Sequence, residues 1–96
     1  MKKQSEKAEI KLSIIMSLYN VELYMRTAVE SVLNQTLKDF ELICINDGST
    51  DYSLMTAQEY AEKDDRIKII TYDKSKGQAF ARNRGMDIAQ GKYIGF

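Results

Sequence analysis

The chain has 96 residues, enough for one small domain and too few for two. Its 14 lysine and arginine residues balance 14 aspartate and glutamate residues, which disfavours nucleic acid as a partner because polyanion binding needs surplus positive charge. One cysteine excludes an internal disulfide, the absence of histidine excludes Ser-His-Asp and Cys-His catalysis, and no apolar run approaches the roughly 20 residues of a transmembrane segment.

Residues 1–10 begin the chain with polar side chains of mixed charge. They lack the apolar stretch of a secretory signal, so we expect a flexible polar leader in a cytoplasmic protein.

Short apolar runs alternate with amphipathic helical patterns along the rest of the chain. In chain order, the patterns predict a strand over 12–16, a helix over 23–34, a strand over 40–45, a helix over 53–63, a strand over 67–71, a helix over 78–90 that Gly91 caps, and a strand over 93–96. Strands that alternate with helices predict an α/β fold built of βαβ units with a parallel sheet. We expect the third strand near a sheet edge and the fourth strand beside the first.

The last residues, 93–96, look like a strand that has only begun. Apolar strands need neighbours for their backbone groups and side chains, so we expect a fold that is truncated in or just after its fourth strand. The exposed edge would then favour self-association of the fragment.

Polar loops follow the predicted strands at the edge of the sheet where α/β proteins bind ligands. Asp47 ends the second strand, where its carboxylate can accept hydrogen bonds from the ribose or base of a nucleotide, and Gly48 permits a tight turn beside it. The other interpretation is an ordinary strand-to-helix turn with a helix N-cap among residues 49–51.

Two more side chains are candidates for nucleotide binding. Tyr19 follows the first strand and can stack on a base, or it is a packed rim residue. Arg82 lies early in the third predicted helix, where a bound phosphate would explain a cation, although a solvated helix flank is the alternative. No G-x-G-x-x-G and no G-x-x-x-x-G-K-[ST] motif is present, which disfavours a nicotinamide dehydrogenase and a P-loop nucleotidase.

Taken together, these stretches carry a resemblance that no single motif carries. In order, they are SIIMSLYNVE at 13–22, QT at 35–36, FELICINDGSTD at 40–51, GQAFARNRG at 77–85 and AQGKYI at 89–94. The series resembles the beginning of a family 2 glycosyltransferase of the Rossmann-like GT-A fold, over nearly the whole chain. On this basis, residues 11–96 are expected to be the N-terminal, nucleotide-sugar-binding part of such a domain.

The resemblance implies a nucleotide-sugar donor, usually a UDP-sugar, and specific roles for several residues. Tyr19 would pack on uracil, Asp47 would accept the uracil N3–H, and Arg82 would help to hold the diphosphate. Glu22 matches a frequent acid of the first motif. The expected nucleotide-binding residues are therefore Ser17, Tyr19, Glu22, Asp47, Gly48 and Arg82.

The sequence departs from the family pattern in several places. Ser17 stands where proline is usual, Asn46 replaces the first Asp of Asp-Asp-Gly-Ser, and Ser75 stands where asparagine is common. The Asp-x-Asp signature that binds Mn²⁺ or Mg²⁺, the acceptor site and the catalytic base are expected beyond Phe96.

The resemblance implies that the intact protein transfers a sugar to a glycan, lipid-linked or other acceptor in bacterial polysaccharide biosynthesis. It implies association with the inner face of the membrane as one possible location, and an inactive 96-residue fragment. The alternative is a non-catalytic α/β nucleotide-binding or interaction module. Sequence beyond Phe96 would discriminate between the two, because an Asp-x-Asp there would support the enzyme.

Overall fold

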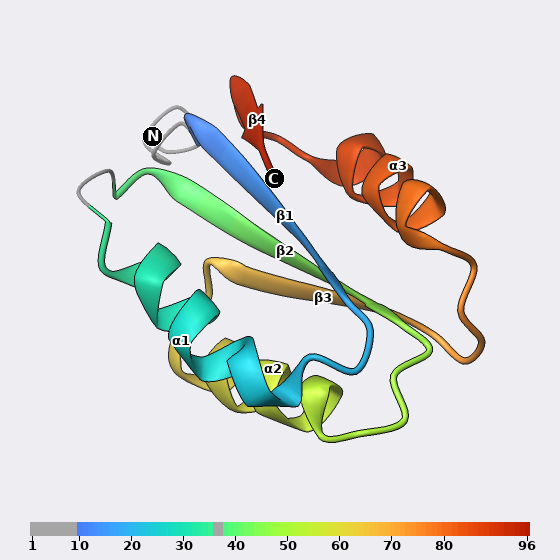
Figure 1. Ribbon diagram of the computed structural model, residues 1–96. Helices are drawn as coiled ribbons and strands as arrows, with labels where there is room; N and C mark the ends of the chain where they lie inside the picture. Colours follow the sequence, from blue (N-terminus) through green and yellow to red (C-terminus); the bar gives the residue numbers. More distant parts are fainter. Residues whose placement is uncertain (1–9, 36–37) are drawn as a thin grey trace.

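The computed structural model describes residues 10–35 and 38–96, so the expected leader lies almost entirely outside the described residues. The elements are β1 (Leu12–Leu18), α1 (Glu22–Leu33), β2 (Phe40–Asp47), α2 (Ser53–Lys63), β3 (Ile67–Tyr72), α3 (Gln78–Ile88) and β4 (Tyr93–Gly95). They form one parallel sheet with alternating helices (Figure 1), which confirms the predicted α/β fold.

The strand order of the sheet is β3-β2-β1-β4. β3 is an edge strand and β4 pairs with β1, as the sequence predicted. The chain first runs outward from β1 through β2 to β3 and then returns across the sheet to β4. Strand order therefore reverses beside β1, and loops that follow β1 and β2 lie next to this switch point, where open α/β sheets bind ligands.

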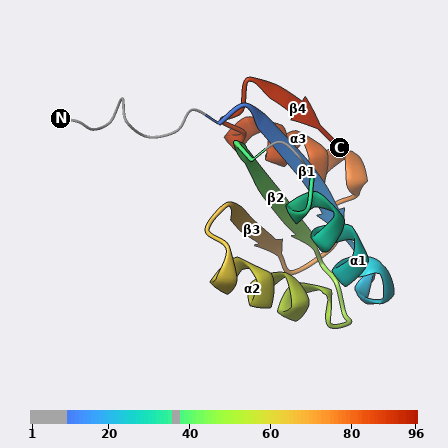
Figure 2. The ribbon, with the colours of Figure 1, turned by 90° about the vertical axis from the view of Figure 1, so that its left-hand side faces the viewer.

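The helices cover both faces of the sheet, with α1 and α2 on one face and α3 on the other (Figure 1 and Figure 2). The larger core cluster joins Leu18, Leu42 and Cys44 of the sheet to Met25 and Val29 of α1 and Ala57 of α2. The smaller cluster packs Ala81 of α3 on Ile15, Ile43 and Ile45. β2 is covered on both faces and paired on both edges, so every one of its residues is buried. Each large aliphatic side chain buried in this way contributes about 1.5–3 kcal/mol.

The end of α3 differs from the prediction. The helix stops at Ile88 and Ala89 is already extended, whereas the sequence predicted a helix to Gln90 with Gly91 as its cap. The backbone amide of Gln90 donates to the buried Glu41 carboxylate over 2.6 Å, which draws the chain out of the helix. Gly91 serves a close approach instead of a cap, because a Cβ atom there would lie 2.6 Å from the backbone nitrogen of Ser13.

Within the part of the chain that the structure describes, no helix has both the length and the apolar character needed to cross a bilayer.

Candidate functional site

A hollow of about 290 Å³ lies at the carboxyl ends of the strands. Its volume is near the lower limit for small-molecule sites, so it has room for part of a nucleotide. The end of β1 and the loop after it, the last residue of β2, the loop after β3 and the first residue of α3 form its wall. The wall residues are Ser17, Tyr19, Val21, Asp47, Ser75, Gly77 and Gln78. The structure therefore brings together three of the predicted site residues: Ser17 of β1, Tyr19 just after β1, and Asp47 of β2.

The Asp47 carboxylate organises this wall. Oδ1 accepts a hydrogen bond from the backbone amide of Lys76 over 2.7 Å. Oδ2 accepts one from the Ser75 hydroxyl over 2.8 Å and one from the backbone amide of Gly77 over 3.0 Å. Burial raises the pKa of Asp47, but the three donors and the nearby Lys76 charge lower it more, so the pKa lies below its usual range. The carboxylate is therefore held in its ionised, acceptor-only form.

Gly48 allows the loop after β2 to touch the loop after β3. Its φ of 73° lies in the left-handed region that favours glycine. A Cβ atom at this position would lie 2.5 Å from the backbone nitrogen of Ser75, closer than real contacts allow. Gly48 is not itself part of the wall of the hollow, so its role in the structure is to let Ser75 reach Asp47.

Tyr19 follows the end of β1 and is 53% exposed, which makes its ring available to a planar ligand. The turn after it is fixed by the loop that follows β2. Asn20 has a φ of 55°, and its side-chain oxygen accepts from the Thr50 amide over 2.8 Å. The Ser49 hydroxyl donates to the Leu18 carbonyl over 3.2 Å. The position of Tyr19 thus depends on polar contacts between two loops.

Glu22 and Arg82 lie outside the wall of the hollow. Glu22 begins α1, and its carboxylate accepts the backbone amide of Tyr52 over 3.1 Å, next to the start of α2. Arg82 is exposed on α3, and its guanidinium carbon lies 5.3 Å from the centre of the Phe96 ring. Nucleotide contacts by these two residues stay predictions.

Three wall residues, Val21, Gly77 and Gln78, were not among the predicted site residues, and Ser75 was noticed only as a departure from a family pattern. The signal that points to them is topological. β2 and β3 are parallel neighbours with Asp47 opposite Tyr72, so the chain that leaves β3 must pass the end of β2. Two of these residues, Ser75 and Gly77, supply donors to Asp47.

The described residues do not form a binding site for a metal ion. In residues 10–35 and 38–96, no three His, Cys, Asp or Glu side chains gather in an arrangement that would hold one. The carboxylate in the wall, Asp47, already accepts three hydrogen bonds. The divalent cation that the resemblance implies has no binding set in this part of the chain.

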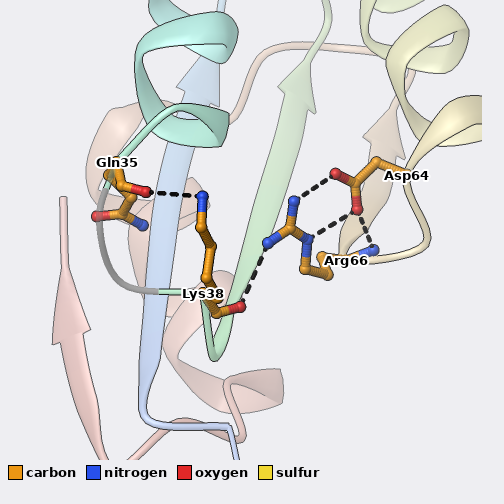
Figure 3. Close-up of polar contacts among 4 residues, drawn as sticks. All are labelled: Gln35, Lys38, Asp64 and Arg66. Atoms are coloured by element: carbon orange, nitrogen blue, oxygen red, sulfur yellow. Dashed lines mark hydrogen bonds and ion pairs between the residues drawn. The ribbon is translucent and has the colours of Figure 1, made fainter.

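A second hollow of about 240 Å³ lies at the opposite, amino-terminal ends of the strands. Arg66 makes most of the polar contacts described for this region. It donates two side-chain hydrogen bonds to Asp64 and a third to the Lys38 carbonyl (Figure 3). Its guanidinium carbon also lies 4.3 Å from the centre of the Phe40 ring. Its hydrogen bonds with Asp64 lower the pKa of that carboxyl. Arg66 therefore fastens the turn before β3 to the loop before β2 and is not available to a ligand.

The sequence model for "Glycosyl transferase family 2" matches residues 13–96. The chain belongs to this family. It is 42% identical over 85 residues to the putative glycosyltransferase EpsH of Bacillus subtilis, a match that covers 88% of this chain and 24% of EpsH. It is 42% identical over 86 residues to the minor teichoic acid biosynthesis protein GgaB of the same species, covering 88% of the chain and 10% of GgaB. The chain thus spans about a quarter or less of these relatives.

Solved structures of the GT-A fold confirm the architecture. The structure of Staphylococcus aureus TarS 1–349 in complex with UDP superposes with a TM-score of 0.80 at 28% identity, over 88% of this chain and 25% of that one. The Pyrobaculum calidifontis mannosyltransferase PcManGT, solved with GDP-Man and Mn²⁺, gives a TM-score of 0.81 at 17% identity, over 92% of this chain and 27% of that one. The predicted Rossmann-like GT-A fold is confirmed by these neighbours.

Proposed function

We propose that residues 11–96 form the N-terminal nucleotide-binding part of a glycosyltransferase that uses a UDP-sugar donor. The observation that carries this proposal is the hollow where the exposed Tyr19 ring and the ionised Asp47 carboxylate occur together at the switch point of the sheet. Support also comes from the similarity to TarS, whose structure has been solved with UDP. The remaining predicted residues, Ser17, Glu22, Gly48 and Arg82, complete the proposed nucleotide-binding set.

The chemistry of the base explains the choice of uracil. Uracil presents an N3–H donor, which an acceptor-only carboxylate can receive, whereas cytosine presents a lone pair at N3 and would be repelled. Oδ1 of Asp47 accepts one hydrogen bond within the protein, so it retains acceptor capacity for a base. Tyr19, half-exposed in the same wall, would cover the ring face.

In the intact protein, we propose direct displacement at the anomeric carbon of the sugar. The acceptor hydroxyl oxygen would form the new bond while the bond to the nucleoside diphosphate breaks, and a general base would take the hydroxyl proton. We propose a glycan, lipid-linked or other acceptor in polysaccharide or teichoic acid assembly, on the similarity to GgaB. A bound Mn²⁺ or Mg²⁺ would stabilise the departing diphosphate, but its ligands would have to come from outside the described residues.

Titration with UDP and CDP, followed by amide chemical shifts with and without Mn²⁺, tests the nucleotide assignment. We expect UDP to shift the amide signals of residues around the hollow, to bind more tightly than CDP, and to need no metal.

Asp47→Asn removes an ionised acceptor whose hydrogen bond is worth about 1.5–3 kcal/mol, so UDP affinity should fall by at least about tenfold. Equal responses to UDP and CDP would contradict the assignment to uracil, and shifts spread over the whole molecule would indicate a non-catalytic interaction module instead.

A separate prediction concerns the 96-residue chain by itself. We expect no sugar transfer, because Asp47 is the one carboxylate in the described wall and its oxygens hold a loop. We also expect self-association through β4, an edge strand whose Tyr93, Ile94 and neighbouring Phe96 are 66%, 43% and 64% exposed. Light scattering should give a mass above the monomer, which Ile94→Lys lowers.

The matched control for that prediction is Leu23→Lys, which replaces an 87% exposed leucine on α1, away from β4. It should leave the mass unchanged. A monomeric wild-type chain would contradict the association, and donor-dependent UDP release by the purified chain would contradict the predicted inactivity.

A further inference from the structure

Ser75 contacts the Asp47 carboxylate and also lines the hollow. We propose that Ser75 is a positioning residue for base recognition, which holds the Asp47 carboxylate so that its remaining acceptor capacity meets the N–H edge of the base. This inference rests on the proposed function, because it assigns a role within the same site. It assigns that role to a residue outside the predicted nucleotide-binding set.

The hydrogen bonds of Asp47 account for this role. A carboxylate offers about four lone-pair positions, and three of them are occupied by Lys76, Ser75 and Gly77. Two of the three donors are backbone amides, which every residue except proline supplies. The Ser75 hydroxyl is the side-chain donor of the set, so it alone is removed by a simple truncation. Without it, Oδ2 keeps only the Gly77 amide, which has the longest of the three hydrogen bonds at 3.0 Å.

The same hydrogen bond fixes the polarity of the wall. Because the Ser75 hydroxyl donates its proton to Asp47, the Ser75 oxygen can act only as an acceptor toward any other group, and Ser75 lines the hollow. Asp47 is also acceptor-only while ionised. The wall therefore favours ligand groups that donate hydrogen bonds, and the loss of Ser75 should reduce the preference for UDP over CDP as well as the affinity for UDP.

Three variants test the role of Ser75 in the 96-residue chain by UDP and CDP titration. Ser75→Ala should weaken UDP binding by about fivefold, the loss expected for one hydrogen bond, and should narrow the ratio of the two affinities. Ser75→Thr keeps the hydroxyl and should restore both. Ser31→Ala removes an exposed hydroxyl on α1, outside the wall of the hollow, so it should preserve both the UDP affinity and the ratio. In an Asp47→Asn background, Ser75→Ala should have no further effect on UDP affinity.

The pKa of Asp47 provides a readout that needs no nucleotide. In the free wild-type chain, the carboxyl ¹³C signal of Asp47 should titrate below the usual aspartate range, because its hydrogen bonds and the Lys76 charge outweigh its burial. Ser75→Ala removes one of these donors and leaves Lys76 in place. The pKa of Asp47 should therefore rise in Ser75→Ala and return in Ser75→Thr.

The outcomes separate this inference from the proposed function. If the wild-type chain prefers UDP and Ser75→Ala binds it equally tightly with the same preference over CDP, the positioning role is overturned and the proposed function stands. If the wild-type chain binds neither nucleotide, the proposed function fails and the role in base recognition fails with it, whatever the pKa of Asp47 does. An unchanged Asp47 pKa in Ser75→Ala would contradict the contact itself.

Discussion

Gly48→Ala should lower the free energy of unfolding by about 3–5 kcal/mol, because two costs add. Left-handed backbone at a non-glycine residue costs about 1–2 kcal/mol. The new Cβ atom would also lie 2.5 Å from the Ser75 nitrogen and 2.9 Å from the Lys74 carbonyl carbon, so the loop after β3 must move. That movement would break hydrogen bonds to Asp47, each worth about 1 kcal/mol. Thermal denaturation should show a melting temperature lower by about 12 °C or more.

Gly77→Ala is the companion variant, because it strains the backbone without a steric contact. Gly77 has a φ of 99° and a ψ of 156°, a region that essentially only glycine adopts, so this variant should also be less stable than the wild type. A Cβ atom there meets nothing within 4 Å apart from its chain neighbours, so the loop after β3 need not move away from Asp47. The pKa of Asp47 should therefore rise in Gly48→Ala and change less in Gly77→Ala. If the pKa of Asp47 does not rise in Gly48→Ala, the two loops are not in close contact in solution.

The elements of the sheet were predictable because each strand and helix carries its own periodic signal. The run at 40–45 is apolar except for Glu41, and a strand covered on both faces requires such a nearly continuous apolar run. In the structure, the strand continues two residues further, to Asp47. The helix over 53–63 was predicted to the residue. Such signals are local, so they can be recognised in the sequence without any knowledge of the tertiary structure.

The contacts that shape the site were not predictable, because they join residues far apart in the sequence. Asp47 was a candidate from its place at the end of a strand, but its partners Ser75 and Gly77 come 28 and 30 residues later. The early end of α3 has the same origin. Gln90 looks like a helical residue in the sequence, and only its bond to Glu41, 49 residues earlier, takes it out of the helix.

The sequence predicted Glu41 only as one residue of an apolar strand. In the structure it is the centre of a polar network inside the sheet. Only 1% of the residue is exposed. Oε2 accepts from the Ser13 hydroxyl over 2.5 Å and from the Gln90 amide over 2.6 Å, and Oε1 accepts from the Lys68 ammonium over 2.6 Å. One side chain thus connects β1, β2, β3 and the segment that leads into β4.

Glu41→Ala should therefore destabilise the fold by about 3–5 kcal/mol, because each buried donor left without an acceptor costs about 1–3 kcal/mol. It would leave the Ser13 hydroxyl and the Gln90 amide without an acceptor, and it would free the start of β4 from the sheet. Glu59→Ala is the matched control. The Glu59 side chain is 49% exposed and pairs with Arg26 at the surface. Its loss should therefore cost at most about 1 kcal/mol. Chemical denaturation of the variants measures both effects.

The pH dependence of stability distinguishes the charge of Glu41 from its volume. Burial raises the pKa of Glu41, but its hydrogen bonds to Gln90, Lys68 and Ser13 lower it more, so the folded-state pKa lies below the unfolded value of about 4.3. The resulting stabilisation is complete above about pH 4.3 and is lost as the pH falls through the folded-state pKa. Glu41→Gln keeps the shape without this titration, so its stability should fall less steeply with acid than that of the wild type. Parallel curves for the two proteins between pH 5 and 2 would show that Glu41 acts through packing and not through its charge.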